Sequence, residues 1–170
     1  MKRIIFLGMI CLLLLGIVAS YVGAEEKILE EEFPYFGKVS KTEVLVYFLW
    51  CDDNFNVIEP VAVKRTVNLH SVIQHAIEKL LEGPSDHERK RYDLRTAIPE
   101  GTKLNNLWID IYRGICYVDF SKELQNYGGG SMNAICIRTQ IEKTLKQFKV
   151  VKKVIITVEG KGEAEGVLQP

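Results

Sequence analysis

The chain has 170 residues, of which 47% are hydrophobic and 26% charged, a composition typical of globular rather than disordered proteins. Lysine plus arginine and aspartate plus glutamate number 22 each, so no net charge would draw the chain to nucleic acid or to acidic substrates. No nucleic-acid partner is expected, and the length leaves room for one domain of ordinary size.

The first 24 residues predict export or membrane anchoring. Lys2 and Arg3 precede an uncharged run, Ile4–Ala24, that is long enough to span a bilayer as a helix. Residues 22–24 are also small enough for a signal peptidase, so a cleaved signal peptide and an uncleaved anchor both stay open. Because the positive end stays inside, the rest of the chain is expected to be extracytoplasmic, attached to the cytoplasmic membrane or secreted.

Residues 25–42 are interpreted as a tether, because they show neither helical nor strand periodicity. Packing of Phe33, Tyr35 and Phe36 back onto the domain is the alternative. Residues 43–50 are nearly all β-branched or aromatic and predict a buried strand, and residues 60–67 predict a second strand that begins at Pro60.

A helix is predicted over residues 68–83, where apolar residues recur at helical spacing and Gly83-Pro84 ends the pattern. The charged stretch of residues 85–95 is interpreted as a solvated loop. Ile98–Gly101 then predicts a type I turn, because Pro99 suits its second position.

Two strands, residues 104–112 and 115–120, are predicted to pair through a two-residue turn at Arg113-Gly114. If the side chains of Leu107 and Cys116 face the helices, three aromatic side chains share the opposite face of the sheet, and an error of one residue in register would invert that assignment. These candidate partner-facing residues are Trp108, Tyr112 and Tyr117.

A second helix is predicted over residues 133–150, capped by Ser131, with an apolar stripe made by Ala134, Ile137, Ile141, Leu145 and Phe148. Cys136 lies off that stripe and is predicted to be a partly exposed thiol. A last strand over residues 152–159 precedes a flexible tail, residues 162–170. The order β-β-α-β-β-α-β predicts an α+β fold in which two helices pack on one face of a mixed sheet.

No pattern in the sequence predicts catalysis, a metal site or a cofactor. The three histidines lie on or just after one helix, and Asp119 and Glu123 straddle a strand end, so neither set supplies the paired groups a hydrolase needs. The cysteines are spaced too widely for zinc. The glycines of residues 128–130 leave a ligand-sensing role open, since glycines before a helix can bind an anion.

Residues 43–161 resemble the GerMN domain of spore germination and sporulation proteins from endospore-forming bacteria. The resemblance rests on an ordered series of short motifs: residues 46–48, 65–67 and 80–84, then Ala-Ile-Pro-Glu-Gly-Thr-Lys-Leu at 97–104, Val-Asp-Phe-Ser-Lys-Glu at 118–123, Gly-Gly-Ser at 129–131, and residues 140–154. A single copy is present, and Cys11 lacks the small preceding residues of a lipid-attachment site.

The resemblance implies a non-enzymatic domain on the outer side of the cytoplasmic membrane, with the core of ring-building motifs. The expected function is an interaction or assembly module in sporulation, germination or cell-envelope assembly. Its expected partners are itself, other envelope proteins and the membrane. A ligand-sensing or cell-wall-processing envelope protein is the alternative, and the predicted sites contain no catalytic, cofactor-binding or metal-binding residue.

Overall fold

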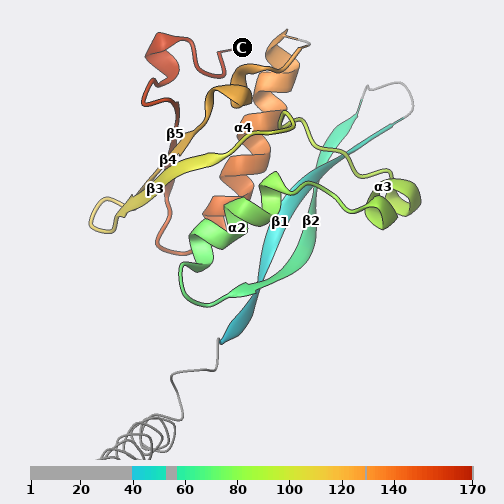
Figure 1. The fold of residues 1–170 in the computed structure, drawn as a ribbon, viewed down its shortest axis with the longest axis horizontal. Helices are drawn as coiled ribbons and strands as arrows, with labels where there is room; N and C mark the ends of the chain where they lie inside the picture. The colour runs from blue at the N-terminus through green and yellow to red at the C-terminus, as the bar shows by residue number, and fades with distance from the viewer. Residues whose placement is uncertain (1–39, 53–56, 129, 170) are drawn as a thin grey trace, which may run out of the picture. The chain divides into compact units, whose positions relative to one another are not determined.

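The computed structural model describes residues 40–52, 57–128 and 130–169, which form one compact unit. The predicted signal or anchor and nearly all of the predicted tether lie outside these residues. The α+β class is confirmed, and the helices and strands of the described part run in this order (Figure 1): β1 Lys41–Cys51, β2 Ile58–Asn68, α2 Val72–Leu81, α3 Asp86–Tyr92, β3 Leu104–Asp110, β4 Ile115–Phe120, α4 Gly130–Lys146 and β5 Lys153–Val158.

The strands form two sheets. β1 and β2 make an antiparallel hairpin, and the second sheet has the order β3-β4-β5, with β4 antiparallel to β3 and parallel to β5. The mixed sheet predicted from the sequence is therefore this three-stranded one, and the hairpin stands apart from it. Helices α2 and α4 pack against each other and against β1, while α2 also contacts β3 and α4 contacts β5 (Figure 1).

The core lies where these two helices meet the three-stranded sheet. On β4, Cys116, Val118 and Phe120 are buried and their neighbours are only partly so, as the period of a half-buried strand predicts. Alternate residues of β5 and the predicted apolar stripe of α4 supply the opposing side chains, and only Phe148 of that stripe stays partly buried. The core side chains of these two elements are Val154, Ile156, Val158, Ala134, Ile137, Ile141 and Leu145.

Helix α3 replaces the solvated loop predicted for this stretch. The side chain of Ser85 accepts a hydrogen bond from the backbone N–H of Glu88, whose carboxylate accepts one from the N–H of Ser85, so the two residues form a capping box. Arg65 of β2 donates to both carboxylate oxygens of Glu88 at 2.7 and 2.6 Å, which fixes the helix to the hairpin. The hydrogen bonds from Arg65 lower the pKa of Glu88 to about 2.

The tight turn before β3 lies one residue later than predicted. The N–H of Thr102 donates to the carbonyl of Pro99 at 3.3 Å, so the turn spans Pro99–Thr102 rather than Ile98–Gly101. Gly101 is then its third residue and has a φ of +80°, the left-handed value that a type II turn requires at this position.

The connection between β3 and β4 is also longer than the two-residue turn predicted. Asp110 pairs with Ile115, which leaves four residues, 111–114, in the loop. The carbonyl of Asp110 accepts a hydrogen bond from the N–H of Gly114 at 2.8 Å, and its carboxylate accepts one from the N–H of Arg113 at 3.0 Å. This wider loop lifts Ile111 and Tyr112 out of the strand and into solvent.

The prediction that residues 162–170 form a flexible tail is wrong for the part that the structure describes, residues 162–169. Val167 and Leu168 are each only 1% exposed and belong to the main core. Arg138 of α4 donates to the carbonyl of Leu168 and pairs with Glu163 at 3.3 Å. Two apolar residues separated from the last strand by a polar, glycine-rich stretch carry no periodic signal, so only the tertiary structure shows that they are anchored.

Candidate interaction surface

Two of the predicted aromatic residues form a stacked pair on the outer face of the three-stranded sheet. Trp108 of β3 and Tyr117 of β4 stand directly opposite each other in the register. Their ring centroids are 4.0 Å apart with the planes 6° from parallel, and Trp108 remains 51% exposed. Cross-strand neighbours are close enough to touch, so the strand register itself brings these rings together.

Tyr112, the third predicted residue, lies in the loop between β3 and β4 and is fully exposed beside the exposed Ile111. The ring contacts made by the described residues do not include Tyr112. The structure therefore unites two of the three candidates and places the third at the end of the same hairpin.

A shallow groove of about 380 Å³ runs beside Trp108, between β3 and the start of α2. Its apolar lining comes from Val72 and Ile73 of the helix, from three consecutive residues of β3, and from Leu69, which precedes the helix and is about half exposed. Sequence reasoning missed Leu69, because a single leucine between a strand and a helix belongs to neither apolar pattern. We call this region the aromatic groove; it consists of Leu69, Val72, Ile73, Leu107, Trp108 and Ile109.

The thiol of Cys136 is not exposed, contrary to the prediction. Cys136 is only 6% exposed, because α4 buries a second stripe of side chains besides its apolar one. Burial raises the pKa of the Cys136 thiol, and burial likewise raises the pKa of Cys116 to about 11. A buried thiol with a raised pKa is a poor nucleophile, so Cys136 is not a candidate reactive site.

The second stripe of α4 closes the outer edge of β1. The side chain of Gln147 exchanges two hydrogen bonds with the backbone of Leu45, at 2.8 and 2.6 Å. The N–H of Tyr47 donates to the hydroxyl of Thr144 at 3.2 Å, and the carbonyl of Tyr47 accepts from the side chain of Gln140 at 2.9 Å. Positions 140, 144 and 147 lie on one face of a helix, which is why three polar side chains reach the same strand.

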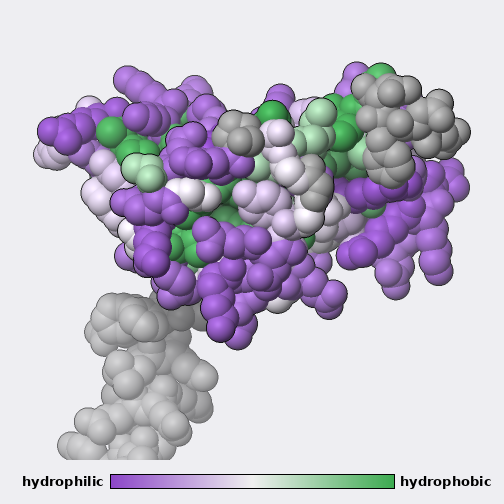
Figure 2. Space-filling model, turned by 90° about the horizontal axis from the view of Figure 1, so that it is seen from above, coloured by the Kyte–Doolittle hydropathy of each residue, from purple (hydrophilic) through white to green (hydrophobic). Residues whose placement is uncertain are grey.

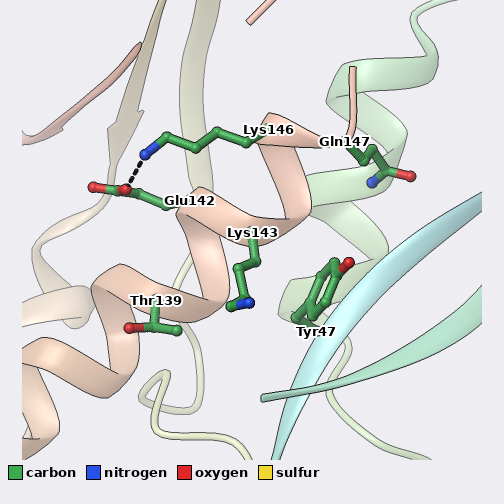
Figure 3. A pocket seen from close by; sticks show the side chains of 6 residues that line it. All are labelled: Tyr47, Thr139, Glu142, Lys143, Lys146 and Gln147. Carbon is green, nitrogen blue, oxygen red and sulfur yellow. Dashed lines mark hydrogen bonds and ion pairs between the residues drawn. The ribbon is translucent and has the colours of Figure 1, made fainter. Parts of the chain in front are cut away.

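The remaining edge residue, Leu49, exchanges backbone hydrogen bonds of 2.8 Å with Arg95. The backbone N–H and C=O groups that residues 45, 47 and 49 point away from β2 therefore all have hydrogen-bond partners. Figure 3 shows this side of α4, with Gln147 toward β1, Lys143 above the ring of Tyr47, and Lys146 paired with Glu142. Gln140 is fully buried, whereas a polar residue on a helix ordinarily indicates a solvent-facing side.

Asp119, considered from the sequence as a possible acid, has a structural role. Its carboxylate accepts hydrogen bonds from the hydroxyl of Thr157, the N–H of Gly160 and the side chain of Asn105. Burial raises the pKa of Asp119, but these hydrogen bonds outweigh burial and hold the pKa below its usual range. Asp119 therefore ties the ends of β3, β4 and β5 together.

Among the described residues, no group of three or more histidine, cysteine, aspartate or glutamate side chains is arranged to hold a metal ion. Within the described ranges, no helix is both long enough and apolar enough to cross a membrane.

Comparison with known proteins identifies the fold. The chain is similar to the first GerMN domain of the sporulation protein GerM from Bacillus subtilis, with 26% identity and a TM-score of 0.52 over 71% of this chain and 85% of that one. The tandem GerMN domains of the same protein match with 24% identity and a TM-score of 0.50, over 72% of this chain and 41% of theirs. Among curated protein sequences none matches.

A family model described as "Germane: Sporulation and spore germination" matches residues 45–163, which is most of the chain and covers β2 to β5, α2, α3, α4 and most of β1. The resemblance found in the short sequence motifs is thereby confirmed. The chain belongs to the Germane family of sporulation and spore germination domains.

Proposed function

We propose that this protein is a non-enzymatic interaction module of the bacterial cell envelope that works in sporulation, germination or envelope assembly. It is held outside the cytoplasmic membrane by its N-terminal segment and associates with a second copy of itself or with another envelope protein. Family membership supports the sporulation or germination context, and the charge pattern of Lys2, Arg3 and the uncharged run after them supports the location.

The observation that carries the proposal is the aromatic groove. Trp108 is half exposed although it stacks on Tyr117, and it borders a groove whose lining is mostly apolar. Exposed tryptophan and tyrosine beside an apolar concavity are the residues on which protein interfaces most often depend. Three side chains with the chemistry of a hydrolase are used otherwise: Asp119 is saturated by structural hydrogen bonds, and the Cys116 and Cys136 thiols are buried.

Replacement of Trp108 by alanine tests the proposal. Trp108→Ala is expected to weaken self-association or partner crosslinking at least about tenfold, which is the loss of a typical interface anchor. The free energy of unfolding should fall by only about 0.5 kcal/mol, since one exposed cross-strand pair is lost. Sedimentation velocity of the full-length chain and crosslinking in intact cells measure the association, and urea denaturation measures the fold.

The matched control is Trp50→Ala, because Trp50 is the other tryptophan of the chain and lies partly exposed on β1, outside the groove. The control should associate like the wild type. If wild type, Trp108→Ala and Trp50→Ala have the same size at every concentration and the same crosslinked partners, the aromatic groove is not the interaction surface.

A further inference from the structure

The outer edge of β5 has backbone groups that the described residues leave without partners. The N–H of Lys153 donates to the carbonyl of Gly114, and the N–H of Glu159 donates to the carbonyl of Phe120, so odd-numbered residues of β5 face β4. In a parallel ladder the residues between them point their N–H and C=O groups the other way. Val154, Ile156 and Val158 therefore present backbone groups to the outer edge.

Only one of these three residues is covered by the described part of the chain. Val158 exchanges two hydrogen bonds with Lys161, at 2.8 and 2.9 Å, as the chain turns back after the strand. Val154 and Ile156 have no such partner within the described ranges. An uncovered strand edge is a ready template for the backbone of another chain, and proteins usually block such edges.

A groove of about 300 Å³ runs along this open edge, between β5 and one side of α4. Residues 152–156 form one wall, and Arg138, Glu142 and Lys146 of α4, together with Glu163, form the other. Its shape is a strand edge beside a helix, which is the arrangement in which an extended peptide can add a strand to a sheet. Val158 is already paired, so the free edge accommodates a short segment.

The charges of the groove favour an acidic occupant. Its two carboxylates are neutralised within the groove, since Glu142 pairs with Lys146 and Glu163 pairs with Arg138. Lys152 and Lys153 are exposed at the open end of the groove, and among the described residues neither lysine forms an ion pair. A second copy of β5 added parallel and in register would bring its own Lys152 and Lys153 against these, and like charges placed opposite each other are unfavourable.

We propose that the edge of β5 binds an extended acidic peptide segment of a partner protein, which adds to the three-stranded sheet as a fourth strand. Its backbone hydrogen-bonds to Val154 and Ile156, and its carboxylates lie near Lys152 and Lys153. This surface is separate from the aromatic groove, because neither Trp108 nor any other residue of that groove contributes to it.

The test titrates the full-length chain with two capped six-residue peptides, one alternating glutamate with valine and the other alternating lysine with valine. The acidic peptide is expected to bind at least about tenfold more tightly than the basic one. Its binding should weaken as salt is added, because the lysines are exposed. Hydrogen exchange at the amides of Val154 and Ile156 should slow on binding, and exchange at Ile155 should change less.

Charge reversal locates the site. Lys152→Glu combined with Lys153→Glu should weaken binding of the acidic peptide at least about tenfold and strengthen binding of the basic peptide. Lys41→Glu combined with Lys90→Glu changes the net charge equally at exposed positions outside the groove, and it should behave like the wild type. The proposal is overturned by equal affinity for the two peptides, by no saturable binding of the acidic peptide up to about 1 mM, or by binding that leaves Val154 and Ile156 unprotected.

Discussion

The edge of β1 and the edge of β5 both lie beside α4, yet they are treated in opposite ways. At β1, Gln140, Thr144 and Gln147 hydrogen-bond to the strand, and Arg95 completes the edge. At β5, α4 presents Arg138, Glu142 and Lys146, which bind one another or the tail rather than the strand. One helix thus closes one strand edge with neutral side chains and leaves the other accessible beside charged ones.

The difference shows how a small domain can specify where its sheets end. Figure 2 shows one face of the molecule, where hydrophilic side chains predominate and hydrophobic ones appear in small separate areas. That face offers little continuous apolar surface for association. A strand edge whose backbone groups are hydrogen-bonded by side chains is closed to another strand, whereas an edge beside charged side chains that pair with each other stays available.

The largest expected effect comes from breaking the closed edge at its centre. Gln140→Leu leaves the carbonyl of Tyr47 and the N–H of Ala97 without their present partners in a buried setting. Each unsatisfied group costs about 1–3 kcal/mol, so the free energy of unfolding should fall by about 3 kcal/mol. Urea denaturation measures this loss, and a change below about 1 kcal/mol would contradict a structural role for Gln140.

The second prediction concerns the charged contact between the hairpin and α3, in contrast to the neutral contacts at the edge of β1. Glu88→Gln should lower the free energy of unfolding near neutral pH by about 2 kcal/mol, because its hydrogen bonds with Arg65 are charge-assisted. The folded-state pKa of Glu88, about 2, lies below its usual value of 4.5, so this stabilisation is present above pH 4.5 and is lost as the pH falls toward 2.

Urea denaturation at several values between pH 2 and about pH 6 checks the direction in which the free energy of unfolding changes with pH. The wild type should lose stability across that window, and Glu88→Gln should lose much less. Some pH dependence should remain in the variant, because the folded-state pKa of Asp119 is also lowered. If both proteins lose stability equally on acidification, the Arg65–Glu88 pair does not fix α3 to the hairpin.

The smallest expected effect comes from removing one hydroxyl at the closed edge. Thr144→Val keeps the size of the side chain and deletes the acceptor for the N–H of Tyr47, which lies at 3.2 Å. The expected loss is about 1 kcal/mol, and the amide of Tyr47 should exchange faster with solvent. Lys146→Gln, a change on the exposed side of the same helix, is the control and should alter neither quantity measurably.

The parts of the fold with strong periodicity were predictable from the sequence. The condition that Cys116 faces the helices and the predicted stripe of Ile137 and Ile141 both agree with the faces that are buried. The stacking neighbours Trp108 and Tyr117 were placed on one face by the same reasoning. Periodicity reports which residues avoid water, so it predicts core-facing positions well.

What periodicity could not show is where polar and isolated residues find partners. Gln140 and Thr144 are polar residues that a helical pattern assigns to solvent, and their burial depends on an unrelated strand lying alongside. Leu69 and Leu168 stand outside any repeating pattern. Helix α3 did leave a local signal, since Ser85 and Glu88 have the spacing of a capping box, but its lack of apolar residues outweighed that signal.

Hydrogen exchange of backbone amides, followed by NMR on the wild-type chain without added peptide, tests the contrast between the two edges most directly. The amides of Leu45 and Tyr47 should be as protected as those of ladder residues in β1, because Gln147, directly after α4, and Thr144 of α4 accept from them. The amides of Val154 and Ile156 should exchange at least about tenfold faster than those of Ile155 and Thr157. Equal protection along β5, or rapid exchange at Leu45 and Tyr47, would contradict the account.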